Sequence, residues 1–437
     1  MFLHGIFIVA YLLTAFLPDT MKCYLMIFHC LCIWYQYFQT RKKFDPLVAY
    51  SIYVTMASIA NLAMIKNVAT GEVSVYYSYI VPEYIGQSLT LWSIGNASLF
   101  AGFTLFSGIS LPSISKLISE PKKLQTMYRV MLVLSFKFLY MGFLQFGSLG
   151  TIISVFSSVG TLFFARLWGY YETRQFKKYA ITLFIIQTVA AILYSFLRLE
   201  MLIPTLALLA GYVLGKGGVK HLLTPKFIPI IFYLLFFNTY FNLYGNYRTQ
   251  LGSGITRITA LAKIAAKDEE VIYENKSEQN IFERSSILPQ VSNVVNLTEQ
   301  NGFYNGIALS PLLMALIPRF LWPEKPIVSL GSWFANEIGQ SYEIDGRYTN
   351  SINMTIPGHL YLDFGLIGVG IGCFLFGGLL VLLWNSCEFY ESVYNLSGVV
   401  FGGYILIISI TGMAADLQIS VTFFAYYLIF YLFKRFL

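Results

Sequence analysis

The sequence predicts an all-α protein that crosses a membrane many times. Of its 437 residues, 57% are hydrophobic and only 12% are charged, and the mean hydropathy is +0.63. Soluble domains carry about twice that share of charged residues. A helix satisfies its own backbone hydrogen bonds in hydrocarbon, and about 20 apolar residues span the bilayer core. We therefore predict a spanning helix wherever the chain has an apolar run of about that length.

Apolar runs of this kind occur twelve times in the chain. The predicted spans are residues 3–18, 21–38, 45–64, 87–110, 128–147, 149–167, 179–197, 200–215, 227–243, 356–384, 398–415 and 418–433. The first run has neither the basic start nor the small-residue cleavage site of a secretory signal, so we predict that it is retained as a helix.

The distribution of Lys and Arg predicts the orientation of the spans. Short loops on one side hold 16 basic residues, including the C-terminal Lys434 and Arg435, whereas those on the other side hold only Lys22, Lys66 and Arg198. Loops rich in Lys and Arg stay in the cytoplasm. The sequence therefore predicts a cytoplasmic (inner) membrane protein with both termini in the cytoplasm.

A polar segment of about 110 residues separates the ninth and tenth predicted spans. We divide the chain into spans 1–9 (residues 1–243), a large extracytoplasmic loop (residues 244–355) and spans 10–12 (residues 356–437). Residues 308–317 are apolar but short and lie among prolines, so we predict an interfacial or re-entrant helix there. The loop holds nine basic and eleven acidic residues, a balance that argues against nucleic-acid binding.

The loop carries apolar residues at helical spacing in several places. Residues 258–272 and 281–295 have this pattern, the second interrupted by Pro289, and residues 329–333 predict a turn followed by a helix. We expect short helices that lie on the membrane surface with their apolar faces down and that cover a cavity between the spans.

Five arginines occur in the loop, namely Arg248, Arg257, Arg284, Arg319 and Arg347. A guanidinium group is always charged, and its planar fork matches phosphate oxygens. Several of them around one cavity would bind a diphosphate, with Lys325 as a further charge. The alternative is that they are solvated or pair with the local acids. Arg319 lies between prolines and aromatic residues near the bilayer, where an unpaired cation is costly.

Two sequence motifs resemble those of a known family. The run Ile317-Pro318-Arg319-x-Leu321-Trp322-Pro323-x-Lys325-Pro326 is followed, about 35 residues later, by Leu360-Tyr361-Leu362-Asp363-Phe364-Gly365-Leu366-Ile367-Gly368. With the large late loop and the spans after it, they resemble the O-antigen and capsule repeat-unit polymerases, the Wzy-type polymerases of bacterial surface polysaccharide loci.

The resemblance implies a GT-C-like glycosyltransferase that acts on the outer (periplasmic) face. Its donor and acceptor would be undecaprenyl-diphosphate-linked oligosaccharides, and a polysaccharide chain-length regulator is a candidate partner. Departure of the lipid diphosphate builds negative charge, which Arg284 and Arg319 would stabilise first, followed by Arg248, Arg347 and Lys325. The loop has no Asp-x-Asp motif, so we predict a reaction without a metal ion or other cofactor.

A general base could activate the acceptor hydroxyl. His359 lies at the outer end of the tenth span, and Asp363 follows one helical turn later, so this pair is our candidate for catalysis. The alternative for His359 is an interfacial residue hydrogen-bonded to a carbonyl, and Glu324 and Asp345 are competing carboxylates. The related ligases have their histidine further from the glycine.

Two other functions fit the same layout. An O-antigen ligase would transfer finished chains to lipid A core, and a lipid-linked oligosaccharide flippase or other transporter would move substrate across the membrane. Transporters tend to show two related halves. The single long loop after the ninth predicted span breaks any six-plus-six symmetry, which favours an enzyme.

Overall fold

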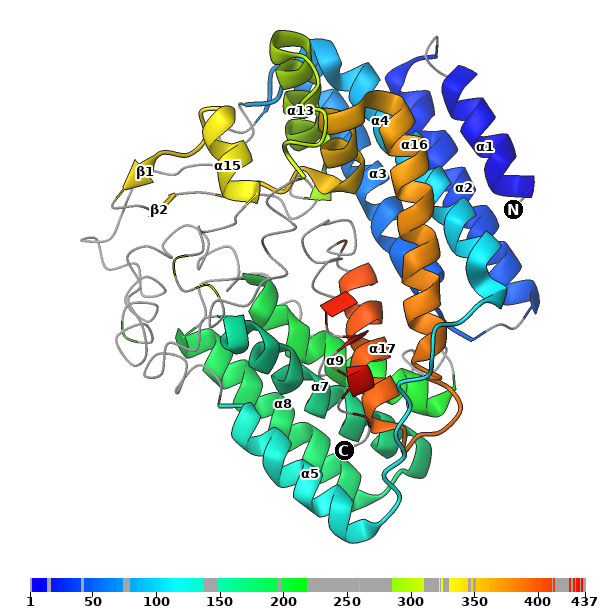
Figure 1. Cartoon of the computed structure of the whole chain (residues 1–437), viewed down its shortest axis with the longest axis vertical. Coiled ribbons are helices and arrows are strands. Elements are labelled where there is room, and N and C mark those ends of the chain that lie inside the picture. Colours follow the sequence, from blue (N-terminus) through cyan, green and yellow to red (C-terminus); the bar gives the residue numbers. More distant parts are fainter. Residues whose placement is uncertain are drawn as a thin grey trace. The chain divides into compact units, whose positions relative to one another are not determined.

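The computed structural model describes most of the chain, in separate stretches. They are residues 2–13, 17–40, 43–73, 79–136, 148–194, 198–217, 285–309, 330–344, 347–348 and 351–410, with isolated positions at 259, 322, 324 and between 412 and 434. These residues are helical apart from connecting segments and one short hairpin (Figure 1). They form two compact units, Met1–Ile114 with Gln279–Cys387 and Ile408–Leu437, and Ser115–Glu278 with Glu388–Ile407.

Four helical stretches in the described part are long and apolar enough to cross a membrane. They are Pro46–Thr70, Pro82–Gly108, Arg174–Tyr194 and Thr355–Ser386, and Leu3–Leu13, Ile203–Lys216 and Leu396–Ile410 are shorter apolar helices. The all-helical membrane class expected from composition is therefore confirmed at this level. The full number of spans stays a prediction.

The ends of the helices follow local sequence signals. In α3 (Pro46–Thr70), the Asp45 side chain accepts a hydrogen bond from the Val48 amide (2.9 Å), and Pro46 occupies the first turn, where its missing N–H costs nothing. Gly71 ends the helix with φ 72°, and its amide donates to Val68.

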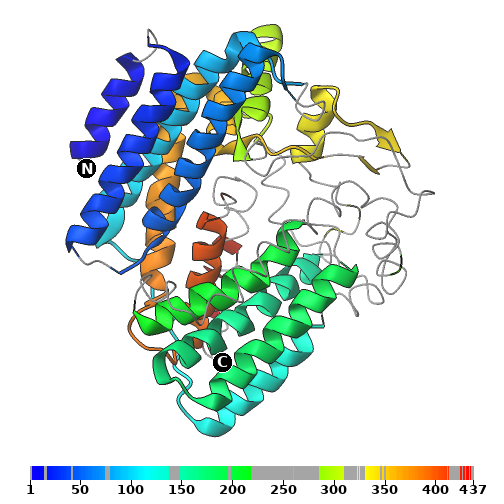
Figure 2. The ribbon, with the colours of Figure 1, turned by 180° about the vertical axis from the view of Figure 1, so that it is seen from behind.

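The first unit begins with four neighbouring helices. These are α1 (Phe2–Leu13), α2 (Asp19–Thr40), α3 and α4 (Ile85–Leu105), the last preceded by the 3-10 turn η3 (Pro82–Tyr84) and followed by η4 (Phe106–Gly108). Figure 2 shows α1 to α4, in blue to cyan, side by side. Large side chains fill their packed faces, with Trp92, Phe100 and Tyr50 almost fully buried.

Helix α16 (Thr355–Ser386) packs closely on α4 through glycine contacts. A Cβ atom at Gly377 would overlap the Leu99 carbonyl oxygen, and one at Gly102 would overlap that of Phe374. These two glycines therefore let the backbones of α4 and α16 approach closely. Exposed apolar residues Ile367, Ile371 and Leu375 recur every four positions on the helix, as expected for a surface that faces lipid.

Helix α16 bends sharply at Gly365, which has φ 64° and ψ −160°. This backbone conformation is accessible essentially only to glycine. The remaining stretch after the bend, residues 366–386, has 21 residues and a length of roughly 31 Å, enough to cross the hydrocarbon core alone. Residues 355–364 therefore form a separate helical segment at the start of α16.

Helix α13 (Leu288–Asn301) corrects two expectations for the polar loop. Pro289 lies in its first turn, so this proline begins a helix instead of interrupting one. The expectation that only an apolar face is covered is wrong for α13, because residues 286–298 are buried on nearly all sides and pack against α4 and α16. The place of this helix relative to the membrane stays a prediction. Helix α15 (Leu330–Glu337) lies where the sequence predicts a helix, and the hairpin of β1 (Glu343–Ile344) and β2 (Arg347–Tyr348) follows it.

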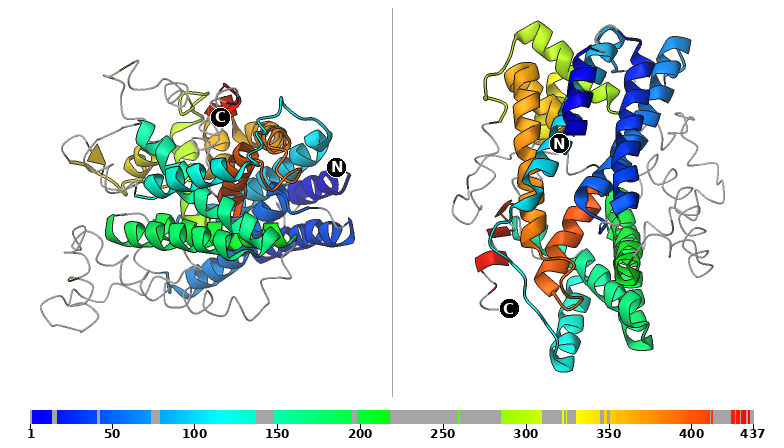
Figure 3. Two further views of the ribbon diagram at one scale, coloured as in Figure 1. Left: turned by 90° about the horizontal axis from the view of Figure 1, so that it is seen from below. Right: turned by 90° about the vertical axis from the view of Figure 1, so that its right-hand side faces the viewer.

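The second unit is built from α5 (Pro121–Leu134), α7 (Ser148–Tyr171), α8 (Arg174–Tyr194), α9 (Arg198–Lys216) and most of α17 (Leu396–Ile410). Figure 3 shows α7, α8 and α9, in green, side by side. Gly211 and Gly215 of α9 form a Gly-x-x-x-Gly pair, and Cβ atoms there would overlap the carbonyl oxygens of Leu162 and Arg166. Small residues at this spacing let two helix backbones approach closely in a membrane.

Candidate functional site

His359 and Asp363 lie on the short helical segment at the start of α16. Residues four positions apart are neighbours on one face of a helix, so both side chains leave the segment on the same side. Both are buried, with exposed fractions of 3% for His359 and 0% for Asp363. The structure therefore brings this predicted pair together inside the first unit.

The chain segment of residues 302–309, which follows α13, crosses the bend of α16. In an unbroken helix the carbonyls of Leu362 and Asp363 accept hydrogen bonds from amides four residues further on. At the bend they accept from Tyr304 N (3.0 Å) and Asn305 N (3.1 Å). The bend at Gly365 thus brings the main chain of residues 302–309 over the site. We call residues 302–309 the covering segment.

The two carboxylate oxygens of Asp363 have different surroundings. Oδ1 accepts hydrogen bonds from Gly306 N (2.9 Å) and Ala308 N (3.2 Å). Oδ2 is sealed from solvent and has no hydrogen-bond partner among the residues that the structure describes. A buried polar atom of this kind is uncommon, because burial without a partner is costly, and more so for a charged group. One oxygen of Asp363 therefore holds the covering segment, and the other is left for a further ligand.

His359 contacts the same covering segment. Its Nε2 atom lies 3.1 Å from the Ala308 carbonyl oxygen. A carbonyl only accepts, so Nε2 carries the hydrogen, and Nδ1 has the lone pair when the ring is neutral. This contact is the one expected from the carbonyl-bound alternative for His359. The main chain of Ala308 is therefore held at both ends, by His359 at its carbonyl oxygen and by Asp363 at its amide nitrogen.

Aromatic residues surround the covering segment. The Phe303 ring packs edge-on against Tyr361, with ring centroids 5.8 Å apart, and Gln87 Nε2 donates to the Tyr361 hydroxyl (2.7 Å). Tyr304 contacts Trp333 of α15 in the same edge-on manner at 5.7 Å. These contacts connect α4, α15 and the covering segment, and no local sequence pattern predicts the Gln87–Tyr361 pair.

The start of α13 is anchored within the first unit by Asn61 of α3. Asn61 Oδ1 accepts hydrogen bonds from Ser286 Oγ (2.9 Å) and Ile287 N (3.1 Å). Arg284, one of the predicted diphosphate ligands, precedes this anchor by two positions in the sequence. The anchor fixes where the chain enters α13, and the covering segment emerges from the other end of this helix.

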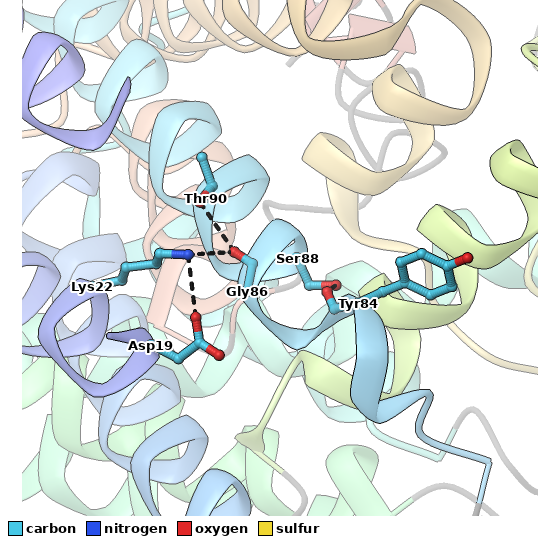
Figure 4. A network of polar contacts seen from close by, with 6 residues as sticks. All are labelled: Asp19, Lys22, Tyr84, Gly86, Ser88 and Thr90. Carbon is cyan, nitrogen blue, oxygen red and sulfur yellow. Dashed lines mark hydrogen bonds and ion pairs between the residues drawn. The ribbon is translucent and has the colours of Figure 1, made fainter. Parts of the chain in front are cut away.

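Lys22 forms a second buried polar cluster in the first unit (Figure 4). Its ammonium group donates to Asp19 Oδ1 (3.2 Å) and to the Gly86 carbonyl (2.8 Å), which also accepts from Thr90 Oγ1 (3.0 Å). By sequence, Lys22 counts with the loop charges at the start of the predicted span 21–38, and the structure places it in the first turn of α2 with 3% exposure. The spacing of Asp19 and Lys22 is the signal that predicts an ion pair on a helix.

The predicted phosphate ligands are not placed by the structure. Arg248, Arg284, Arg319 and Lys325 lie outside the described residues. Arg347 is described only in its main chain, where it pairs with Ile344 in the hairpin. The convergence of these cations on one cavity therefore stays a prediction.

Comparison with known proteins identifies a family. A family model described as "Domain of unknown function (DUF8712)" matches residues 47–437. The chain belongs to this family. No curated protein and no solved structure matches the chain. The match begins at α3 and includes the complete His359–Asp363 site, so the covering segment and the bent helix lie within the family domain.

Proposed function

We propose that this member of the DUF8712 family is a membrane glycosyltransferase that joins lipid-linked oligosaccharide repeat units into a surface polysaccharide. The proposal combines the resemblance of the Pro318–Pro326 and Leu360–Gly368 motifs to repeat-unit polymerases with the surroundings of Asp363. The observation that carries it is the buried and unpartnered Oδ2 atom of Asp363, within the second motif.

A carboxylate with this arrangement is suited to act as a general base. Its Oδ1 atom is fixed by two main-chain amides, so the group has a defined orientation without using Oδ2. A purely structural carboxylate would have its second oxygen hydrogen-bonded or exposed to water. His359 acts as a positioning residue, because its Nε2 donates to the carbonyl of Ala308, the residue whose amide Asp363 binds.

In the proposed reaction, Asp363 Oδ2 accepts the proton of a hydroxyl at the non-reducing end of the acceptor. The hydroxyl oxygen attacks the anomeric carbon of the donor chain, and the bond from that carbon to the diphosphate oxygen breaks. Undecaprenyl diphosphate leaves with the bonding electrons. Arg284, Arg319, Arg248, Arg347 and Lys325 stabilise the charge on it, and the covering segment moves aside to admit the acceptor.

The proposed topology is the one predicted from the sequence. Twelve spans in a GT-C-like arrangement would place both termini in the cytoplasm and residues 244–355 in the periplasm. The start of α16 and the covering segment would then lie at the outer face, where lipid-linked repeat units are presented. The reaction would need no metal ion, because cationic side chains would stabilise the negative charge that develops on the leaving diphosphate.

Deletion of the chromosomal gene in a Gram-negative host distinguishes this proposal from its rivals on a single lipopolysaccharide gel. Loss of a polymerase leaves lipid A core that carries one repeat unit. Loss of a ligase leaves bare core while polymer accumulates on its carrier, and loss of a flippase leaves bare core and no external polymer. Either of the last two patterns would refute the proposal.

A variant and a reconstitution test its chemical part. Arg319→Ala should abolish chain elongation while the protein still inserts at the wild-type level, and near-normal chain lengths would remove Arg319 from the mechanism. Purified protein should elongate lipid-linked repeat units in the presence of EDTA. Loss of elongation that Mg²⁺ or Mn²⁺ restores would show that a metal ion is required.

A further inference from the structure

Arg166 is a buried cation of the second unit that the proposed reaction does not use. It lies in α7 with 2% of its surface exposed. Its Nε and Nη1 atoms are sealed from solvent and have no hydrogen-bond partner in the described part of the chain. None of the ion pairs among the described residues includes it. Two of the three guanidinium nitrogens are therefore dehydrated and unpartnered, and no described carboxylate supplies a counter-charge.

The contacts of Arg166 compensate only part of the free-energy cost of burying an unpaired cation. Its guanidinium carbon lies 4.5 Å from the centre of the Phe389 ring and 5.9 Å from that of Tyr390. Aromatic faces attract a cation, but less strongly than an ion pair with hydrogen bonds would. Glu388 and Glu391 lie on the same turn as these rings, and neither pairs with Arg166. The missing partner is thus an anion from outside the described part of the chain.

The position of Arg166 along α7 indicates what kind of anion this is. Arg166 precedes the helix end at Tyr171 by five residues, roughly 7.5 Å along the helix axis. Trp168 packs against Tyr212 with ring centroids 4.6 Å apart, and Lys177 Nζ lies 5.7 Å from the Trp168 ring. Aromatic and basic residues of this kind gather where a helix passes through the lipid headgroups.

The charge distribution of the sequence predicts that this end of the unit faces the cytoplasm. The cytoplasmic leaflet carries anionic phospholipids, and basic sites between spanning helices bind their headgroups. A phosphate group offers the charge and the acceptor oxygens that the Arg166 nitrogens lack. We propose that Arg166 binds the phosphate of an anionic phospholipid in the cytoplasmic leaflet.

The cover over Arg166 is a short turn, which gives the headgroup a way in. Phe389 and Tyr390 lie between Glu388 and Glu391, and Glu391 N donates to the Glu388 carbonyl (3.1 Å). Glu388 has φ 46°, which non-glycine residues seldom adopt. The headgroup reaches the guanidinium when this turn lifts, and its phosphate then replaces the aromatic contact with hydrogen bonds.

Thermal unfolding of the purified full-length protein in detergent tests this site. The probes are phosphatidylglycerol, diacylglycerol without phosphate, and inorganic phosphate. The melting temperature of the wild type should rise by about 2–4 °C with phosphatidylglycerol and should not change with diacylglycerol. Arg166→Met should abolish the rise. Arg174→Met, which removes an exposed charge at the start of α8, should respond as the wild type does.

Each outcome decides part of the proposal. An equal rise with inorganic phosphate would support a phosphate site and identify a free anion as its ligand, in place of a lipid. A rise in Arg166→Met that equals the wild-type rise would overturn the site. Arg166→Gln replaces the methionine variant if that variant does not fold. If neither folds, the wild type alone decides, because an equal response to phosphatidylglycerol and diacylglycerol would also overturn the site.

Discussion

Two buried charges of the first unit, Lys22 and Asp363, have opposite surroundings. The Lys22 ammonium donates both to the Asp19 carboxylate and to the Gly86 carbonyl. A side chain at Gly86 would leave no space for this cluster, because a Cβ atom there would lie 2.9 Å from Asp19 Oδ1. Asp363 is buried at least as deeply, and one of its oxygens has no partner.

The difference between these two regions separates a structural charge from a candidate functional one. A buried cation whose partners all come from the protein is complete without a ligand, and Lys22 serves to fix α2 against α4. A buried carboxylate with one unpartnered oxygen has all its hydrogen bonds only when another molecule supplies a donor. Substitution of Lys22 should therefore affect the stability of the protein, whereas substitution of Asp363 should affect the reaction.

The largest effect is expected for Asp363→Asn. The amide oxygen can still accept from Gly306 N and Ala308 N, so the covering segment keeps its anchor. The amide nitrogen cannot accept a proton, so the rate of chain elongation should fall by about 10²–10⁴-fold. Lipopolysaccharide gels and assays on purified protein measure this rate, and thermal unfolding measures the stability.

The outcome that contradicts this expectation is normal elongation by an Asp363→Asn variant that folds normally. Asp363 would then resemble Lys22 as a structural residue. A large loss of stability together with loss of elongation would also favour the structural role. Asp363→Glu serves as the partner variant, because it keeps the carboxylate and displaces it by one methylene.

The next largest effect is expected for Gly365→Ala, which alters the bend below Asp363. A Cβ atom there would lie 3.1 Å from Phe303 Cζ, and φ 64° with ψ −160° is unfavourable for alanine. The free energy of unfolding should fall by about 1–3 kcal/mol, and elongation should fall with it as Asp363 shifts. Gly370→Ala is the matched control in the same helix, because nothing lies within 4 Å of its Cβ position.

A Gly365→Ala protein with the stability and activity of Gly370→Ala would show that the bend is not required. The contrast between Lys22 and Asp363 would then not depend on the bend, although the bend is what exposes the Leu362 and Asp363 carbonyls to the covering segment. Calorimetry or fluorescence-detected unfolding of the two purified variants makes this measurement.

A smaller effect, on stability alone, is expected for Lys22→Met. The Gly86 carbonyl keeps its hydrogen bond from Thr90, and the Asp19 side chain is about a third exposed, so water can replace the lost cation. The free energy of unfolding should fall by about 1–2 kcal/mol while elongation stays close to the wild-type rate. Lys66→Met, an exposed cation of α3, should change it by less than about 0.5 kcal/mol. Loss of elongation in Lys22→Met without loss of stability would assign Lys22 to the reaction.

Sequence patterns predict where the helices lie better than they predict how the site is built. Apolar length alone places α3 and α16 close to their observed ranges, and Pro46 and Gly71 mark the ends of α3. The bend is different, because α16 contains several glycines and local sequence does not show which of them takes a positive φ. That choice depends on the covering segment, whose residues lie about 60 positions earlier in the chain.

Burial of polar residues was the other feature that local patterns could not predict. Helix α13 is rich in Ser, Asn, Thr and Gln, so its sequence is typical of a surface helix. Its burial depends on partners such as Asn61, more than 200 residues away in the chain. The burial of Lys22 likewise depends on the Gly86 carbonyl, 64 positions later. Single-sequence periodicity carries no information about such distant pairs.

The smallest effect is expected for His359→Gln. This variant decides whether His359 is a structural residue, like Lys22, or takes part in the reaction, like Asp363. A glutamine amide nitrogen can donate to the Ala308 carbonyl as Nε2 of His359 does, so elongation should stay within about tenfold of the wild type. His359→Ala removes that donor and leaves the carbonyl buried without it. The covering segment should then shift, and elongation should fall by up to about 10²-fold. If His359 is itself the base, both variants will lose elongation to the extent that Asp363→Asn does. Rates measured side by side for the three proteins therefore assign the proton acceptor to Asp363 or to His359.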